Sequence, residues 1–243
     1  MGAMMSLVLF FMRRNFPLSI KGLGEWAASP FILFVSAALG SLRGAVPDLV
    51  SIAVPNVLLF VGVYAAYHGS QRFFGVATAI RRWVAILAVI VFVSLWYTLV
   101  EPSYRARLML LSLPLGVLFA LHAYLVFRKA PPTFSSWLAL VVLLGAVAIQ
   151  ILRFVSIWTT PHDTSVFDPA SPQAIFLAAY TFVILLFSIS VVLMATDRLR
   201  TEFEHLATHD SLTDAFTRRH MNEACQQELE RCRRNGHVMS FLG

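Results

Sequence analysis

Charged residues are scarce in this chain. Asp, Glu, Lys and Arg make up 13% of the 243 residues, whereas 58% of the residues are hydrophobic. A soluble domain carries about 25% charged residues, so this composition excludes an ordinary soluble protein. It predicts an integral membrane protein whose few charges lie mainly at the ends of apolar segments.

Other features that the sequence lacks exclude further kinds of site and protein class. The two cysteines, Cys225 and Cys232, would lie two turns apart on one face of a helix, too far for a disulfide. No Cys/His cluster has zinc spacing, so no metal site is predicted. The apolar segments contain no acidic proton relay and no recurring pair of interrupted segments, which disfavours a transporter.

Six apolar segments have roughly the length that a membrane-spanning helix needs, about 20 residues. They are Trp26–Leu42, Val50–Gly69, Trp83–Leu99, Leu108–Phe127, Trp137–Trp158 and Ala174–Ala195. A shorter segment, Met4–Met12, would span about 13.5 Å as a helix, less than half of the hydrocarbon core. We interpret it as the end of a spanning helix whose start is missing. Residues 1–195 are therefore predicted to form an all-α bundle of six or seven transmembrane helices.

Proline and tryptophan positions agree with such a bundle. Pro30, Pro55 and Pro114 lie inside apolar segments and are expected to kink these helices without breaking them, because neighbouring helices satisfy the freed carbonyls. All five tryptophans lie at or near segment ends, which predicts an interfacial aromatic belt.

The basic residues predict the orientation and explain the net charge of +6 without a nucleic-acid partner. With the C-terminus inside, the inner segments carry Arg13, Arg14, Lys21, Arg72, Arg81, Arg82, Arg128 and Lys129. The outer loops then carry only Arg43, Arg105 and Arg107. Cytoplasmic loops are richer in Lys and Arg, so a cytoplasmic C-terminus is predicted.

A polar helix is expected to continue from the last apolar segment over residues 196–209. Leu199, Phe203 and Leu206 follow the four-then-three spacing of a heptad, with polar residues between them. This narrow apolar seam favours pairing with a second copy in a homodimer, although a solvated connector would show similar spacing. The helix is expected to end near Thr208–Asp210, whose side chains favour caps and turns.

The residues that follow resemble the opening of a GGDEF domain, the diguanylate cyclase fold. The family pattern D-x-L-T-G-L-x-N-R-R is matched at Asp210, Leu212, Thr213, Arg218 and Arg219. Its departures from the pattern include Asp214, where the family has Gly, and Thr217, where it has Asn. Thr217 keeps a side-chain oxygen that can cap the following helix. The match covers about 39 of the 243 residues.

The resemblance implies a bacterial inner-membrane enzyme that makes cyclic di-GMP from two GTP with Mg²⁺. Residues 210–243 would be the start of its α/β domain: an amphipathic helix over 218–235, followed by a strand over 237–243. The chain ends before the family's catalytic motif, so no catalytic residue is assigned. Asp210 with Arg218 or Arg219 is expected to form an ion pair that fixes the turn. The alternative is a membrane receptor or dimerisation module without enzymatic activity.

The signal that the bundle would sense is not specified by the sequence. Arg153 lies within an apolar segment, and with Arg105 and Arg107 it could form an outer-side site for an anionic ligand or a lipid headgroup. Glu101 and Asp163 are its candidate partners, although Arg153 could instead extend to the membrane surface. His122, in mid-segment, is either a ligand-binding residue or hydrogen-bonded to a neighbouring helix.

Overall fold

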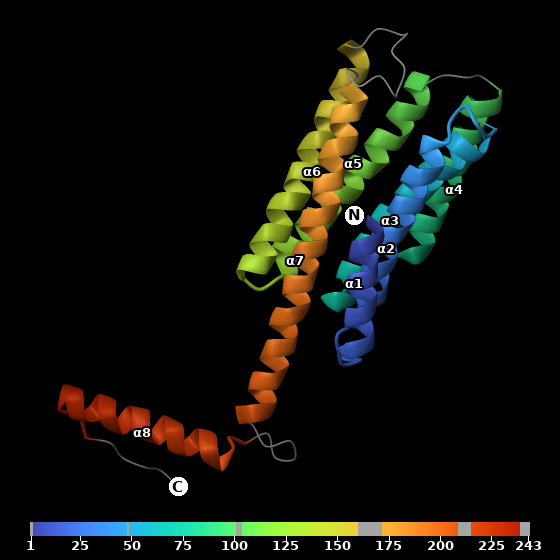
Figure 1. Cartoon of the computed structure of the whole chain (residues 1–243). Helices are drawn as coiled ribbons and strands as arrows, with labels where there is room; N and C mark the ends of the chain where they lie inside the picture. Colours follow the sequence, from blue (N-terminus) through green and yellow to red (C-terminus); the bar gives the residue numbers. More distant parts are fainter. Residues whose placement is uncertain (1, 48, 101–103, 160–171, 209–214, 239–243) are drawn as a thin grey trace. The chain divides into compact units, whose positions relative to one another are not determined.

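The computed structural model describes residues 2–47, 49–100, 104–159, 172–208 and 215–238, and within them the only regular structure is helical apart from isolated bridges. The chain divides into two compact units, Met1–Ala195 and Thr196–Gly243 (Figure 1). The elements are α1 Gly2–Asn15, α2 Leu23–Ser41, the π-helical turn η1 Leu49–Ala53, α3 Val54–Phe73, α4 Ile80–Leu99, α5 Tyr104–Lys129, α6 Phe134–Thr159, α7 Pro172–Thr208 and α8 Arg218–Asn235.

Six of these helical segments are long and apolar enough to cross a membrane, and they correspond to the six predicted segments. The all-α fold and the multi-pass membrane architecture are therefore confirmed. The short N-terminal segment forms α1, whose 14 residues are too few to span a bilayer. This helix packs against α2, where the Ser6 hydroxyl donates to the Ala27 carbonyl at 2.7 Å and Leu9 is fully buried.

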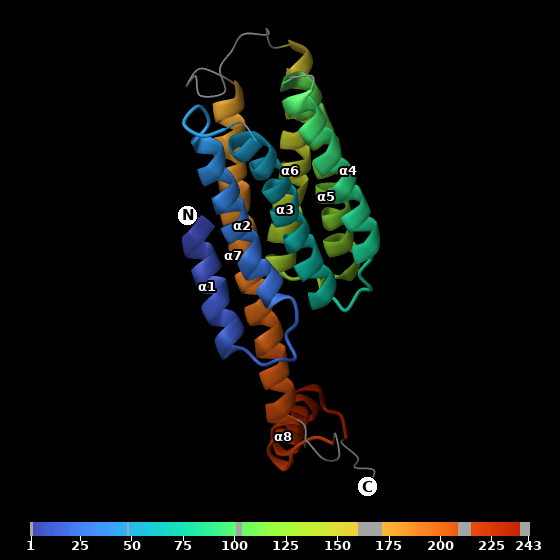
Figure 2. The same ribbon diagram turned by 90° about the vertical axis from the view of Figure 1, so that its right-hand side faces the viewer.

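Consecutive spans run in opposite directions (Figures 1 and 2). We call the end at which α2, α4 and α6 finish the far end, and the end at which α3 and α5 finish the connector end. The closely packed helix pairs are α1–α2, α2–α3, α3–α4, α3–α5, α4–α5 and α5–α6. Helix α7 belongs to none of these pairs, although it extends through the same unit.

Helices α2 and α3 approach most closely at a pair of glycines at the connector end. Gly22 has φ +92°, and a Cβ there would lie 2.2 Å from the Gly69 carbonyl oxygen. A Cβ on Gly69 would lie 2.6 Å from Cδ1 of Trp26. Small residues that allow such backbone contact are typical of membrane helix pairs, so this contact anchors α2 to α3.

Trp26 corrects part of the aromatic-belt prediction. Its side chain is 1% exposed, and its indole N–H lies 3.2 Å from the Ala66 carbonyl and 3.1 Å from the Ser70 hydroxyl on α3. The prediction was wrong for this residue because the ring fills the space that the two glycines leave. It is a core residue between helices and does not face an interface.

The three prolines are accommodated differently. Pro30 and Pro114 lie inside α2 and α5, which continue past them as predicted. Pro55 lies in the first turn of α3, directly after the π-helical turn η1, and the helical segment Leu49–Phe73 continues past it.

The C-terminal unit, Thr196–Gly243, contains the last part of α7 and the amphipathic helix α8. Helix α8 has the predicted bounds and ends in a left-handed residue, Gly236, at φ +69°. The N–H of His237 donates to the Cys232 carbonyl at 3.0 Å, which closes the helix in a Schellman motif. The predicted strand over 237–243 falls mostly outside the described residues, and His237 and Val238 have no regular structure.

Candidate functional site

A cavity of about 440 Å³ lies inside the bundle, lined mainly by α2, α3, α5, α6 and α7. Its lining extends along α2 from Trp26 to Pro30 and on to Gly40, and then to Arg43 beyond the helix end. At 1.5 Å per residue, this range corresponds to about 25 Å. The cavity is therefore long and narrow and follows the helix axes between the two ends of the bundle.

A polar cluster lines the cavity toward its far end. Gln150 and Arg153, one turn apart on α6, face the same side. The Gln150 amide nitrogen donates to the Ser112 carbonyl on α5 at 2.9 Å, and the Tyr180 hydroxyl on α7 donates to the Gln150 amide oxygen. Gln150 is 2% exposed, so its amide connects three helices inside an apolar surrounding.

The Arg153 guanidinium lies over the ring of Tyr180, with Cζ 6.0 Å from the ring centroid. Tyr180 also stacks on Phe119 of α5, with ring centroids 6.5 Å apart and planes 14° apart. The Nε of Arg153 is buried and has no hydrogen-bond partner among the described residues. An aromatic face stabilises a nearby cation, but it leaves the guanidinium N–H groups able to bind an anion.

The predicted three-arginine site is only partly described. Arg105 and Arg107 lie in α5, and their side chains are outside the described part of the structure, as are the candidate partners Glu101 and Asp163. The structure adds Arg43, which follows α2 at the far end and lines the same cavity as Arg153. No sequence pattern linked Arg43 to Arg153, because they are on different helical hairpins.

His122 lines the cavity toward the connector end. Its Nε2 lies 2.7 Å from the Ser70 hydroxyl, which also accepts the Trp26 indole N–H. The ring of Phe187 on α7 meets the His122 ring edge to face at 5.1 Å. These contacts agree with the hydrogen-bonded interpretation of His122 and provide an explanation for this buried side chain without a ligand.

Helix α7 is connected to the rest of the bundle largely through the lining of this cavity. Tyr180 contacts Gln150, Arg153 and Phe119, and Phe187 contacts His122. Among the described residues, these side-chain contacts link α7 to α5 and α6. A change in the positions of the cavity-lining side chains is therefore expected to alter the position of α7.

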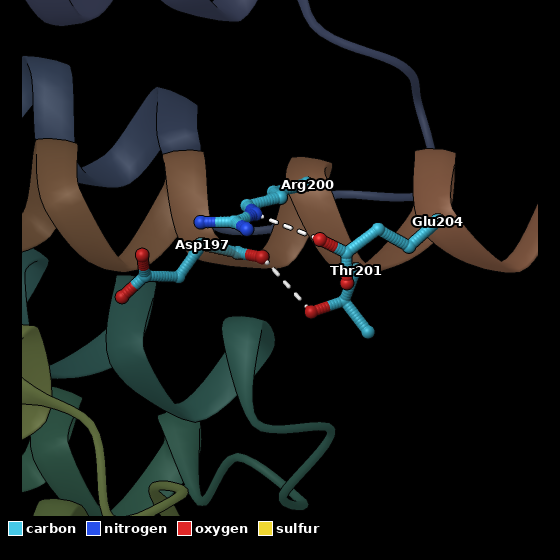
Figure 3. Close-up of polar contacts among 4 residues, drawn as sticks. All are labelled: Asp197, Arg200, Thr201 and Glu204. Carbon is cyan, nitrogen blue, oxygen red and sulfur yellow. Dashed lines mark hydrogen bonds and ion pairs between the residues drawn. The ribbon is translucent and has the colours of Figure 1, made fainter. Parts of the chain in front are cut away.

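The same helix carries the predicted dimer seam after Ala195. Phe203 and Leu206 are 60% and 63% exposed, and Leu199 is half-buried. On the polar faces, Arg200 pairs with Glu204 at 2.7 Å and Arg198 with Glu202 at 3.8 Å. Figure 3 shows the Arg200–Glu204 pair beside Thr201, whose hydroxyl donates to the Asp197 carbonyl at 3.0 Å. These i,i+4 contacts support the helix itself and leave the apolar seam uncovered.

Helix α7 ends at Thr208, as predicted, and Thr217 connects it to the start of α8. The Thr217 N–H donates to the Thr208 carbonyl at 2.8 Å, and the Thr217 hydroxyl donates to the Ala207 carbonyl at 3.3 Å. Thr217 directly precedes α8 and satisfies carbonyls at the end of α7. This contact joins the two helices of the C-terminal unit and was not predicted, because Thr217 was assigned only to the helix that follows.

The remaining residues of the GGDEF-like turn give less information. Asp210, Leu212 and Thr213 are outside the described residues, and the side chains of Arg218 and Arg219 at the start of α8 are outside them too. The expected ion pair of Asp210 thus stays a prediction. Within the described residues, no group of three His, Cys, Asp or Glu side chains could hold a metal ion.

Comparisons with known proteins add no relative. No family model, no curated protein and no solved structure matches this chain. The interpretation therefore depends on the short sequence pattern after α7 and on the geometry described above.

Proposed function

We propose that this chain is the membrane sensory region and the beginning of the catalytic domain of a diguanylate cyclase. Residues 1–195 receive a signal, residues 196–209 transmit it, and residues 210–243 begin the GGDEF domain. Cyclic di-GMP synthesis from two GTP would require a complete GGDEF domain after these residues. The basic residues at the connector end support a cytoplasmic C-terminus in a bacterial inner membrane.

The observation that carries this proposal is the length of α7. Its 37 residues correspond to about 55 Å, whereas the hydrocarbon core is about 30 Å thick. One uninterrupted helix thus contains both the cavity-lining residues Tyr180 and Phe187 and the exposed seam residues Phe203 and Leu206. A displacement of the helix at the cavity is transmitted to the seam without an intervening loop.

The seam supports a homodimer as the signalling state. Two copies that bury Phe203 and Leu206 against each other remove both side chains from water, which favours association. Rotation or translation of α7 changes the register of this pairing and hence the relative position of the two domains that follow. In the GGDEF family, catalysis requires two GTP-loaded domains to face each other.

The chemistry itself is not assigned to any residue of this chain. The described residues offer no set of acidic side chains that fits Mg²⁺, and no phosphate-binding loop occurs in the sequence. The role proposed for the chain is regulation and dimerisation.

Cyclic di-GMP production from GTP and Mg²⁺ tests this function. The assay compares the 243-residue chain with a chain continued along its reading frame. We expect product only from the continued chain. If neither yields product, the alternative becomes the better account: a membrane receptor or dimerisation module without enzymatic activity, which the exposed seam also supports.

A further inference from the structure

We propose that the bundle cavity binds a single-chain amphiphile with an anionic headgroup, namely a long-chain fatty acid, with its carboxylate at Arg153. The regulatory part of this inference rests on the proposed function, whereas the binding part rests on the cavity alone. Three features of the cavity support this ligand: its charge, its shape and its position against α7.

The charge of the lining is unbalanced. The described lining contains two arginines, Arg43 and Arg153, and no Asp or Glu. Both belong to the far end of the bundle, because Arg43 follows α2 and Arg153 lies in the last two turns of α6. A cation within a membrane-spanning segment, such as Arg153, is costly unless it is paired. A carboxylate from a ligand would supply the pair and accept the hydrogen bond that the buried Nε of Arg153 lacks among the described residues.

The donors around Arg153 suit one small headgroup. Tyr180 supports the guanidinium from its ring face, while its hydroxyl and the Gln150 amide are already engaged with each other. Gln150 also donates its amide N–H to Ser112. The polar cluster is thus preorganised and offers chiefly the guanidinium, which a carboxylate can engage through two parallel hydrogen bonds.

The rest of the cavity suits an alkyl chain. From Arg153 toward the connector end, the lining includes Leu115, Phe119, Leu143, Ile184 and Val191. A volume of about 440 Å³ distributed over this length favours an extended, narrow ligand. It lies near the lower end of the usual range for ligand pockets, about 300–1,000 Å³. A two-chain phospholipid would have to leave one chain outside.

Occupancy would act directly on α7. Leu177, Tyr180, Ile184, Phe187 and Val191 present one face of α7 to the cavity. An alkyl chain placed along this face would contact α7 and α5 together and would bear on the Phe187–His122 contact. A ligand with different affinities for two positions of α7 would shift their populations.

Direct binding to the 243-residue chain tests the site. The chain is placed in phosphatidylcholine nanodiscs, and saturable binding of radiolabelled hexadecanoate is measured against empty nanodiscs. Loss of a charge-assisted hydrogen bond costs about 1.5–3 kcal/mol, so Arg153→Gln is expected to weaken binding at least about tenfold. Arg128→Gln is the matched control, because Arg128 lies at the connector end of α5 and does not line the cavity.

Two further measurements distinguish the contribution of the carboxylate headgroup from that of the alkyl chain. Hexadecan-1-ol, which has the same chain without the charge, is expected to compete poorly with hexadecanoate on the unmodified chain. Ser188→Phe is expected to abolish binding while Arg153 remains, because Ser188 lines the cavity from α7 and a phenyl ring there would occupy the path of the chain. Thermal unfolding of each variant in the same nanodiscs verifies that it is folded.

Three results would overturn the proposal. They are unchanged hexadecanoate affinity in folded Arg153→Gln, equal competition by hexadecan-1-ol, and displacement of hexadecanoate by phosphatidylglycerol at equal concentration. The last result would identify Arg153 as a phospholipid headgroup site. Because binding is measured without enzyme activity, failure to bind leaves the cyclase proposal standing, and an inactive continued chain leaves the fatty-acid site standing.

Discussion

The hydroxyl of Tyr180 on α7 donates a hydrogen bond to the side-chain oxygen of Gln150 on α6. This bond is one polar link between α7 and the rest of the bundle, beside the contact of Arg153 with Tyr180, and Gln150 itself is held by the Ser112 carbonyl on α5. Hydrogen bonds between membrane helices contribute about 0.6 kcal/mol on average and about 1.7 kcal/mol at most.

We expect Tyr180→Phe to lower the free energy of unfolding by about 0.5–2 kcal/mol, because it removes the donor and leaves the buried Gln150 oxygen without it. Unfolding in mixed SDS micelles measures the change. Tyr124→Phe is the control, since Tyr124 is 61% exposed on the outer surface of α5. Equal losses in the two variants would contradict a special role for the Tyr180 hydroxyl.

Gly69→Ala is expected to destabilise the bundle by about 1–3 kcal/mol. The new methyl group would lie 2.6 Å from Trp26, which is packed between α2 and α3 and cannot move without losing its hydrogen bonds. Gly145→Ala on α6 is the matched control, because no atom lies within 4 Å of a Cβ there. The same unfolding titration compares them, and an equal or larger loss in Gly145→Ala would refute the argument.

The seam on α7 predicts a specific cross-linking pattern. In a background with Cys225→Ser and Cys232→Ser, Phe203→Cys is expected to form a disulfide-linked dimer in membranes under mild oxidation. Thr201→Cys, two residues away, is expected to cross-link weakly because its side chain points to the polar face. Non-reducing gel electrophoresis provides the measurement. Cross-linking that is equally efficient at both positions would argue against a defined seam.

Thr217→Val tests the contact between α7 and α8. The variant keeps the shape and the backbone N–H bond to Thr208 but loses the hydroxyl that donates to Ala207. We expect local protection against hydrogen exchange at the start of α8 to fall by about 0.5–1.5 kcal/mol. Thr201→Val, which removes a hydroxyl bonded within α7 itself, should leave α8 unchanged. A similar effect of both variants on α8 would contradict the assignment.

The helical spans could be predicted because each depends on local composition. About 20 apolar residues define a span regardless of its neighbours, and the α8 stop signal at Asn235–Gly236 is equally local. The contacts among Trp26, Ser70 and His122 could not be predicted, because they join positions 44 and 52 residues apart in sequence. Inside a bilayer the hydrophobic effect does not drive helices together, because the lipid tails are as apolar as the side chains. The pattern of apolar residues therefore gives no information on which helix faces meet.

The candidate site was predictable only in part for the same reason. Arg153 is conspicuous as a charge within an apolar segment, and the sequence identified it. Its aromatic support by Tyr180 and the shared cavity with Arg43 depend on the order in which helices pack. Neither aromatic residues nor arginines at segment ends carry a spacing signal that pairs them across separate hairpins.

The contrast between α2–α3 and α7 has a mechanical consequence. The contact of Gly22 with Gly69 and the buried Trp26 hold the backbones of α2 and α3 against each other. This helix pair is therefore the fixed part of the bundle. Helix α7 has few close backbone contacts with the other described helices and packs through side chains, among them Val191 and Ala195, which are 1% and 0% exposed. It can therefore change position without breaking a backbone contact like the one that fixes α2 against α3. A ligand can shift α7 between two positions only by the difference between its affinities for them, and a tenfold difference corresponds to about 1.4 kcal/mol.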